Sequence, residues 1–355
     1  MKDLIPVIAR FLVRFLFLLP ITSQAFAGPY TIQNRGVKFF RHAIRSIAMD
    51  KKGTLYYGTY GSGMGVLSRK GFRVWNSQNS FVPEDRVNSL FYDKNDDLLL
   101  LGTCGGIAIY DLKTRKAKIL TEKDGLAENI THTILRHKKT VFIGTTEKGL
   151  DTWTVEKGFC TFTSQNTNNG LLSDWINGNV FDTSGRMWVG TAEGLVYYDK
   201  KSGWGHLSRE DGLRSDFVSQ IDIWEDDLWI ATFDSGLARY KIKSKTIDIF
   251  DINSGLPANE VFFIDAFSPG KAWVATLRGI SEISGGQVQS YTKKHGLFDP
   301  WIKCVLKSSA GVFAGSSKGI LYKKVKNRFE PLIIQMKTHP KFRYHFLKNF
   351  STDNN

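Results

Sequence analysis

A short glycine-threonine motif recurs seven times along the 355-residue chain and constrains its fold more than any other feature. The copies read YYGTYGSGMG, LLGTCGGI, FIGTTEKGL, WVGTAEGL, WIATFDSGL, WVATLRGI and FAGSSKGI. Successive copies are separated by 40 to 46 residues, and alanine replaces the glycine in two of them. A repeat of this period, with four strands in each copy, is typical of a β-propeller. The sequence therefore predicts an all-β, seven-bladed β-propeller of four-stranded antiparallel blades.

Each copy of the repeat reads as four short strands joined by turns. The first strand is rich in β-formers, as in IRSIAMD, and turns such as DTSG follow it, because Asp supports a tight turn and Gly accepts a positive φ. The second strand ends at the Gly/Ala-Thr/Ser pair and carries an aromatic residue in most copies. We expect these aromatic residues to fill the wedges between blades; they are Tyr56, Phe142, Trp188, Trp229, Trp273 and Phe313. The last strand of the ring could come from residues 30–36 or from residues 328–334, and the sequence does not choose between them.

The first 27 residues have the three parts of a secretory signal peptide. Basic residues lead into the apolar run FLFLLPIT, and Ala25 and Ala27 then form an A-x-A site, so we predict cleavage after Ala27. The alternative is an uncleaved membrane anchor, but the apolar run is short and Pro20 interrupts it. We therefore expect a periplasmic or secreted bacterial protein with no transmembrane segment after cleavage.

The mature chain divides, on this interpretation, into a propeller over residues 28–335 and a basic and polar C-terminal tail over residues 336–355. The net charge of +14 suits a protein that meets anionic surfaces. The basic residues are scattered among turns, without the basic helix or aromatic-basic stripe of a nucleic-acid module, so no nucleic-acid partner is expected. The three cysteines are widely spaced and odd in number, so we expect free thiols at strand positions: Cys104, Cys160 and Cys304.

Residues 182–195, DTSGRMWVGTAEGL, hold the fullest copy of the unit D-x-x-G…W-x-G-T-x-x-G-[LI]. Residues 226–237 and 271–280 match this unit with alanine in place of the glycine of the Gly-Thr pair, and the other four copies lack the tryptophan. The unit resembles the two-component regulator propeller repeat, and the resemblance covers residues 44–332. It implies an exported sensing propeller of a membrane-bound hybrid sensor kinase. Such sensors continue into a β-sandwich module, a membrane helix and a kinase, which this sequence lacks, so we expect a free-standing exported propeller.

Residue patterns for catalysis or metal binding are weak in this chain. None of the seven histidines lies in a metal-ligand spacing, and His132, on a predicted inner strand, is the single candidate catalyst. Residues 93–97, DKNDD, begin like a calcium loop but lack its glycine and its distant glutamate. No G-x-S-x-G elbow or phosphate-binding loop is present. We therefore expect no catalytic residue, no metal and no cofactor.

Candidate binding residues lie where two sets of loops surround one mouth of the predicted channel. The connections SDWI, SDFV and FDPWI place three aromatic residues just before inner strands, and other loops and one inner strand add polar and aromatic groups. Aromatic faces beside charged groups suit sugars or peptides. The alternative is that the aromatic residues pack under the loops as wedges between blades. The candidate ligand-binding residues are Trp175, Phe217, Trp301, Arg45, Tyr60, Asp234 and Arg278.

The function that these features favour is a non-enzymatic, monomeric recognition module that binds a small molecule, a glycan or an envelope protein at this mouth. A propeller enzyme of lyase or hydrolase type is one alternative. The chain resembles streptogramin-opening lyases in fold only, and their His/Glu pair with magnesium cannot be placed in this sequence. A scaffold whose ligand is another envelope protein is the second alternative.

Overall fold

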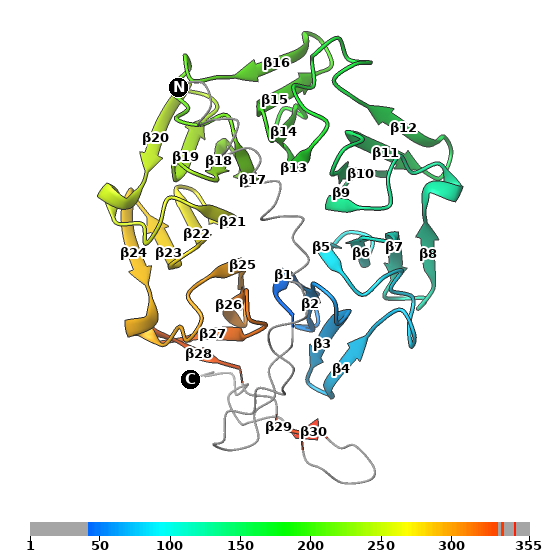
Figure 1. Ribbon diagram of the computed structural model, residues 1–355, viewed down its shortest axis with the longest axis vertical. Helices are drawn as coiled ribbons and strands as arrows, with labels where there is room; N and C mark the ends of the chain where they lie inside the picture. The colour runs from blue at the N-terminus through cyan, green and yellow to red at the C-terminus, as the bar shows by residue number, and fades with distance from the viewer. Residues whose placement is uncertain (1–41, 333–334, 337–343, 346–355) are drawn as a thin grey trace, which may run out of the picture. The chain divides into compact units, whose positions relative to one another are not determined.

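The computed structural model describes residues 42–332, 335–336 and 344–345. In this part of the chain seven four-stranded antiparallel sheets form the blades of a propeller, which confirms the predicted fold class (Figure 1). The predicted signal peptide, residues 1–27, and the candidate closing segment, residues 30–36, lie outside the described residues. Within them, no helix is long and apolar enough to cross a membrane.

Every blade consists of four strands that are consecutive in sequence. The first three blades contain β1 (Ile44–Met49), β2 (Leu55–Thr59), β3 (Met64–Ser68), β4 (Gly71–Trp75), β5 (Val87–Asp93), β6 (Leu98–Thr103), β7 (Gly106–Asp111), β8 (Ala117–Leu120), β9 (Thr131–His137), β10 (Thr140–Thr145), β11 (Leu150–Thr154) and β12 (Gly158–Phe162). Blades four and five contain β13 (Ile176–Phe181), β14 (Met187–Thr191), β15 (Gly194–Asp199), β16 (Gly203–Leu207), β17 (Val218–Trp224), β18 (Asp227–Thr232), β19 (Leu237–Lys241) and β20 (Thr246–Phe250).

Blades six and seven contain β21 (Val261–Ser268), β22 (Lys271–Thr276), β23 (Gly279–Ser284), β24 (Gln287–Tyr291), β25 (Ile302–Ser308), β26 (Gly311–Ser316), β27 (Leu321–Val325) and β28 (Arg328–Pro331). Three single 3₁₀ turns lie between blades, at η1 (Glu122–Asp124), η2 (Ile252–Ser254) and η3 (Lys293–His295). Part of the predicted tail forms the short pair β29 (Gln335–Met336) and β30 (Tyr344–His345), and the rest of it lies outside the described residues.

The first strand of each blade is the innermost, and these strands contact one another around the ring (Figure 1). Strand β28 supplies the outer strand of blade seven, so residues 328–331 take the position that the sequence left open. The ring closes where β1 contacts β25, and there Cys304 Sγ lies 3.7 Å from the Ile44 carbonyl oxygen. Closure among the described residues is therefore by packing between complete blades.

The recurring Gly-Thr pair has a separate physical reason for each of its two residues. A Cβ built on Gly144 would lie 2.4 Å from Thr133 Cγ2 and 2.6 Å from Ile176 Cγ2, so the next inner strand packs directly on the glycine. The threonine ends the second strand, and its hydroxyl donates to a carbonyl across the following turn at 2.7–2.9 Å in blades one to six. The motif therefore encodes close packing of blades and a rigid turn at the mouth.

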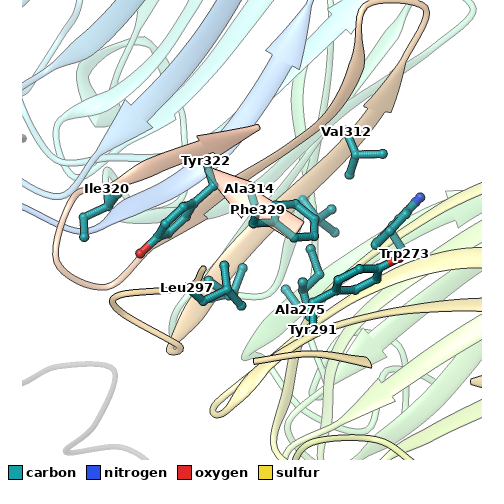
Figure 2. Close-up of a cluster of buried hydrophobic side chains, with 12 residues drawn as sticks. Trp273, Ala275, Tyr291, Leu297, Val312, Ala314, Ile320, Tyr322 and Phe329 are labelled. Carbon is teal, nitrogen blue, oxygen red and sulfur yellow. The ribbon is translucent and has the colours of Figure 1, made fainter. Parts of the chain in front are cut away.

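The aromatic residues of the second strands lie between blades, as predicted. Trp188, Trp229 and Trp273 are each at most 1% exposed. Trp273 of blade six packs with Val312, Tyr322 and other apolar residues of blade seven, as Figure 2 shows. Phe142 is the exception, because it is only partly buried.

All three cysteines are free thiols, as the spacing predicted. Cys160 lies in β12 and is exposed, and Cys304 lies in β25 and is buried. The prediction of a strand position is wrong for Cys104, which follows the last residue of β6 and begins the turn at the mouth.

Candidate functional site

A β-bulge near the start of every inner strand is the feature that organises the mouth of the channel. In all seven blades the pairing register of the first strand with the second shifts at the second residue of the first strand. Bulges re-aim a side chain and are frequent next to functional sites. We call these seven residues the bulge ring; they are Arg45, Asn88, His132, Asn177, Ser219, Phe262 and Lys303.

The bulge ring is held together by contacts that run from blade to blade. Arg45 donates to Asn88 Oδ1 at 3.0 Å, and Asn88 Nδ2 donates to the Thr131 carbonyl oxygen at 3.0 Å. On the next two blades, Asn177 Nδ2 donates to the Val218 carbonyl oxygen at 2.8 Å, and Ser219 likewise bonds to blade six. Asn88, Asn177 and Ser219 thus link neighbouring blades by hydrogen bonds. The charged and aromatic members of the bulge ring make other contacts, described next.

Four aromatic rings form a continuous line over blades five to seven, and we call them the aromatic arc. Phe217, just before β17, lies 5.5 Å from Phe233, measured between ring centroids. Phe233 lies 5.6 Å from Phe262 of the bulge ring, and Phe262 lies 6.0 Å from Trp301. Phe217 and Trp301 are half-buried, so each keeps part of its surface accessible. Among the described residues Trp301 Nε1 is buried without a hydrogen-bond partner.

Two basic residues of the bulge ring lie over aromatic faces. The guanidinium of Arg45 is 4.3 Å from the ring centroid of Tyr60. The ammonium of Lys303 is 4.0 Å from the centroid of Phe262 and 4.1 Å from that of Trp301. Burial, and then the nearby charge of Arg45, lowers the pKa of Lys303 to about 7. Burial also lowers the pKa of Arg45. Both cations are therefore partly withdrawn from water, and the charge of Arg45 acts on Lys303.

His132 and Trp175 lie in the same part of the mouth. The Nδ1 atom of His132 lies 3.2 Å from Asn177 Oδ1 and 3.3 Å from Trp175 Nε1. Burial first, and the charge of Arg45 second, lowers the pKa of His132 to about 4, so the imidazole is neutral near neutral pH. Trp175 follows the alternative that the sequence left open, of an aromatic residue packed under the loops: its side chain is 6% exposed and lies beside His132.

The structure brings five of the predicted site residues to the mouth and leaves two at its edge. Arg45, Tyr60, Trp175, Phe217 and Trp301 contact the bulge ring or the aromatic arc. Asp234 and Arg278 are exposed on turns after second strands, and their side chains make no hydrogen bond or ion pair with any described residue.

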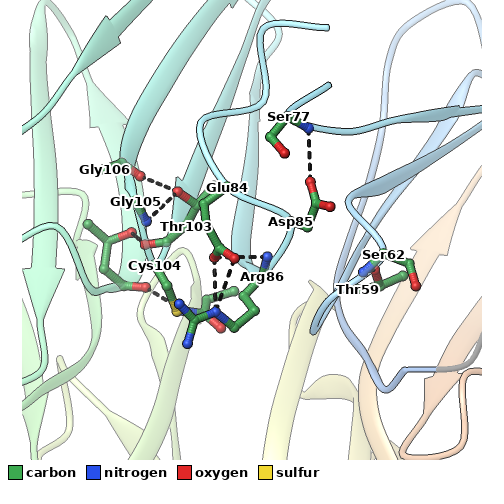
Figure 3. Close-up of polar contacts among 12 residues, drawn as sticks. Thr59, Ser62, Ser77, Glu84, Asp85, Arg86, Thr103, Cys104, Gly105 and Gly106 are labelled. Atoms are coloured by element: carbon green, nitrogen blue, oxygen red, sulfur yellow. Dashed lines mark hydrogen bonds and ion pairs between the residues drawn. The ribbon is translucent and has the colours of Figure 1, made fainter. Parts of the chain in front are cut away.

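The turns around the mouth are held by short-range hydrogen bonds. In Figure 3, which shows the mouth side of blades one and two, Thr103 Oγ1 donates to the Gly106 carbonyl oxygen at 2.7 Å and accepts from the Gly105 N–H at 3.0 Å. In the connection that leads into β5, Arg86 Nε donates to a Glu84 carboxylate oxygen at 3.0 Å. Such turns present side chains from a rigid frame, which lowers the entropy lost on binding.

Six members of the bulge ring were not predicted as binding residues, although the sequence contains a signal for them. When the first strands are aligned on the repeat, the second position reads Arg, Asn, His, Asn, Ser, Phe and Lys, between core positions that are mostly apolar or small. A position that varies this much inside a regular repeat is typical of a surface that the core does not constrain. The missed members are Asn88, His132, Asn177, Ser219, Phe262 and Lys303, and Phe233 of the aromatic arc was missed as well.

Two half-buried carboxyl groups lie further along the inner strands, toward the opposite end of the channel. Asp222 of β17 and Asp265 of β21 occupy equivalent positions, three residues beyond the bulge. Burial raises the pKa of Asp222 to about 6, and burial together with the charge of Asp222 raises that of Asp265 to about 8. Backbone N–H groups of Ala266 and Lys307 donate to them. The described residues contain no cluster of three side chains able to hold a metal ion.

No family model and no curated protein matches the sequence. Among solved structures, the chain is similar to the extracellular domain of the putative hybrid two component system BT3049 from B. thetaiotaomicron, with a TM-score of 0.69 and 23% identity over 81% of this chain and 40% of that one. The extracellular domain of the putative one component system BT4673 from the same organism matches with a TM-score of 0.64 and 17% identity over 84% of this chain and 40% of that one.

Virginiamycin B lyase from Staphylococcus aureus is similar with a TM-score of 0.64 and 11% identity, over 80% of this chain and 94% of the lyase. The chain spans about two fifths of the length of the two sensor domains. Similarity at such low sequence identity indicates a shared fold and does not indicate a shared activity. The chain thus shares its propeller fold with extracellular domains of two-component-system sensors.

Proposed function

We propose that this chain is an exported, non-catalytic recognition module that binds its ligand at the mouth lined by the bulge ring and the aromatic arc. The observation that carries the proposal is the bulge ring itself. Seven bulges at equivalent positions bring seven side chains to one opening, and the frame around them is fixed by repeated core and turn residues. A rigid concave site with a few polar groups and several aromatic faces is the usual form of a ligand site.

Two further observations support binding over catalysis. The imidazole of His132 contacts the Asn177 amide and the Trp175 indole, and its low pKa makes it a weak base. The inner-strand acids that a lyase-like mechanism would need, Asp222 and Asp265, lie beyond the bulge ring and accept backbone N–H groups. The similarity to extracellular sensor domains is consistent with a module that recognises a signal outside the cell.

A thermal-shift screen of the mature chain against oligosaccharides, organic acids and peptides tests the proposal, followed by calorimetric titration of each hit. Replacing Phe262 with alanine should weaken binding by roughly tenfold to a hundredfold, since truncation of an aromatic anchor costs about 1–3 kcal/mol of binding energy. Val155→Ala is the matched control, because Val155 is 77% exposed in the turn between β11 and β12 at the other end of blade three. Equal affinity of both variants would contradict binding at the mouth.

The same ligand separates a binding module from an enzyme. A recognition module should release its ligand chemically unchanged after prolonged incubation, as mass spectrometry would show. Turnover that is lost in His132→Ala would establish the propeller enzyme instead.

A further inference from the structure

Two cations of the bulge ring lie on neighbouring blades, and neither forms an ion pair with any acid of the described residues. Arg45 is the second residue of β1 and Lys303 the second residue of β25, and these two inner strands contact each other where the ring closes. The charge of Arg45 helps to lower the pKa of Lys303 and that of His132. Two like charges in a poorly hydrated site repel each other and favour the binding of an anion.

No carboxylate of the described residues neutralises either cation. Neither residue forms an ion pair there, and Asp299, the acid whose charge acts on Lys303, already has other partners. Its Oδ2 accepts from the Ser317 hydroxyl at 2.9 Å and from the Lys318 N–H at 2.7 Å. The cation–π contacts with Tyr60 and with the aromatic arc offset part of the cost of desolvation, but they remove no charge.

Hydrogen-bond donors also remain unused at this place. The guanidinium of Arg45 has five N–H donors, and within the described residues one hydrogen bond is formed, to Asn88. The ammonium of Lys303 has three donors and forms none there. Trp301 Nε1, beside Lys303, is a buried donor with no partner in the same part of the chain. Buried donors normally have acceptors, so these groups together indicate an acceptor-rich ligand.

We propose that Arg45 and Lys303 form an anion-binding subsite of the mouth, for a carboxylate, sulfate or phosphate group on a ligand whose ring-shaped body packs against the aromatic arc. This inference rests on the proposed binding function and names the class of its ligand. Arg suits planar oxyanions because its donors are fixed as a fork, and Lys adds a compact second charge. An acidic oligosaccharide and an aromatic acid share this chemistry, so the test includes both.

Calorimetric titration at pH 6 compares four probes at equal ionic strength: trigalacturonate, its neutral counterpart galactotriose, benzoate and inorganic phosphate. We expect trigalacturonate or benzoate to bind at least tenfold more tightly than galactotriose. Arg45→Gln and Lys303→Met should each reduce that affinity at least tenfold. Lys157→Gln, which removes an exposed cation from the turn between β11 and β12 at the other end of blade three, should change it less than twofold.

Phosphate provides a readout that does not depend on the ligand body. It should raise the melting temperature of the wild type above that in chloride of equal ionic strength, and this difference should disappear in Lys303→Met. Equal stabilisation of wild type and variant would overturn the anion subsite, even if no larger probe binds. Binding of galactotriose that Phe262→Ala abolishes and Arg45→Gln leaves unchanged would overturn the subsite and retain the proposed function. If an anionic probe binds with the same affinity to wild type, to both cation variants and to Phe262→Ala, the anion subsite and the proposed function are both overturned.

Discussion

Replacing Trp175 and Trp301 separately with alanine should separate a core residue from a binding residue. Both tryptophans precede an inner strand at equivalent places, but Trp175 is 6% exposed and donates toward His132, whereas Trp301 is half-buried beside Lys303. Truncating a fully buried tryptophan costs about 3–5 kcal/mol of unfolding free energy. Trp301 is less completely buried than Trp175 and removes less apolar area from water, so its truncation should cost less, about 2–3 kcal/mol.

The melting temperatures give the assay. At about 2 °C per kcal/mol for a chain of this size, Trp175→Ala should lower the melting temperature by about 6–10 °C and Trp301→Ala by about 4–6 °C. Ligand binding should show the opposite order, with the greater loss in Trp301→Ala. Val155→Ala again serves as the control, because Val155 is 77% exposed at the far end of blade three and its truncation should affect neither measurement strongly. An equal fall in melting temperature for Trp175→Ala and Trp301→Ala would show that Trp301 is core and would refute this reasoning.

Three further predictions concern packing, redox state and pH. Gly144→Ala should destabilise the fold by about 1–3 kcal/mol in urea unfolding, because the new methyl group meets Thr133 and Ile176 of the neighbouring strands; no loss would refute the packing role of the motif. Unfolding without reductant should release three reactive thiols, with Cys160 alone reacting quickly in the native state; recovery of one thiol would reveal a disulfide. The pKa of Lys303 is lowered to about 7 in the fold, with Arg45, Asp299, Phe262 and Trp301 around it, so its charge destabilises the fold below pH 7 and this cost disappears toward pH 10. Lys303→Met should therefore raise the melting temperature more at pH 6 than at pH 9.5, and an equal change at both pH values would contradict the assignment.

The fold was predictable because its determinants are local and repeated. Each second strand ends at the threonine or serine of the motif, and the tryptophans of blades four to six lie between blades as expected. The closing strand was not predictable, because residues 30–36 and 328–334 both have strand character, and only the packing of complete blades selects β28 for blade seven.

The candidate site was predictable in position but not in detail. Loop residues such as Tyr60 and Trp301 were found because connections to inner strands are visible in the sequence. The burial of Trp175 could not be predicted, because it depends on a contact with His132, which lies 43 residues away and on another blade. Lys303 was missed because it lies at a bulge. A bulge is a change in the pairing of two strands, and the alternation of apolar and polar residues along one strand does not reveal it.

The central claim is that the mouth formed by the bulge ring is the place where this protein meets its ligand. A crystal structure of the mature chain with a ligand from the thermal-shift screen tests it most directly. We predict ligand density over the bulge ring, in contact with the aromatic arc and within hydrogen-bond distance of Arg45 or Lys303. Ligand density at the opposite end of the channel, beside Asp222 and Asp265, or against an outer strand of a blade, would contradict the claim.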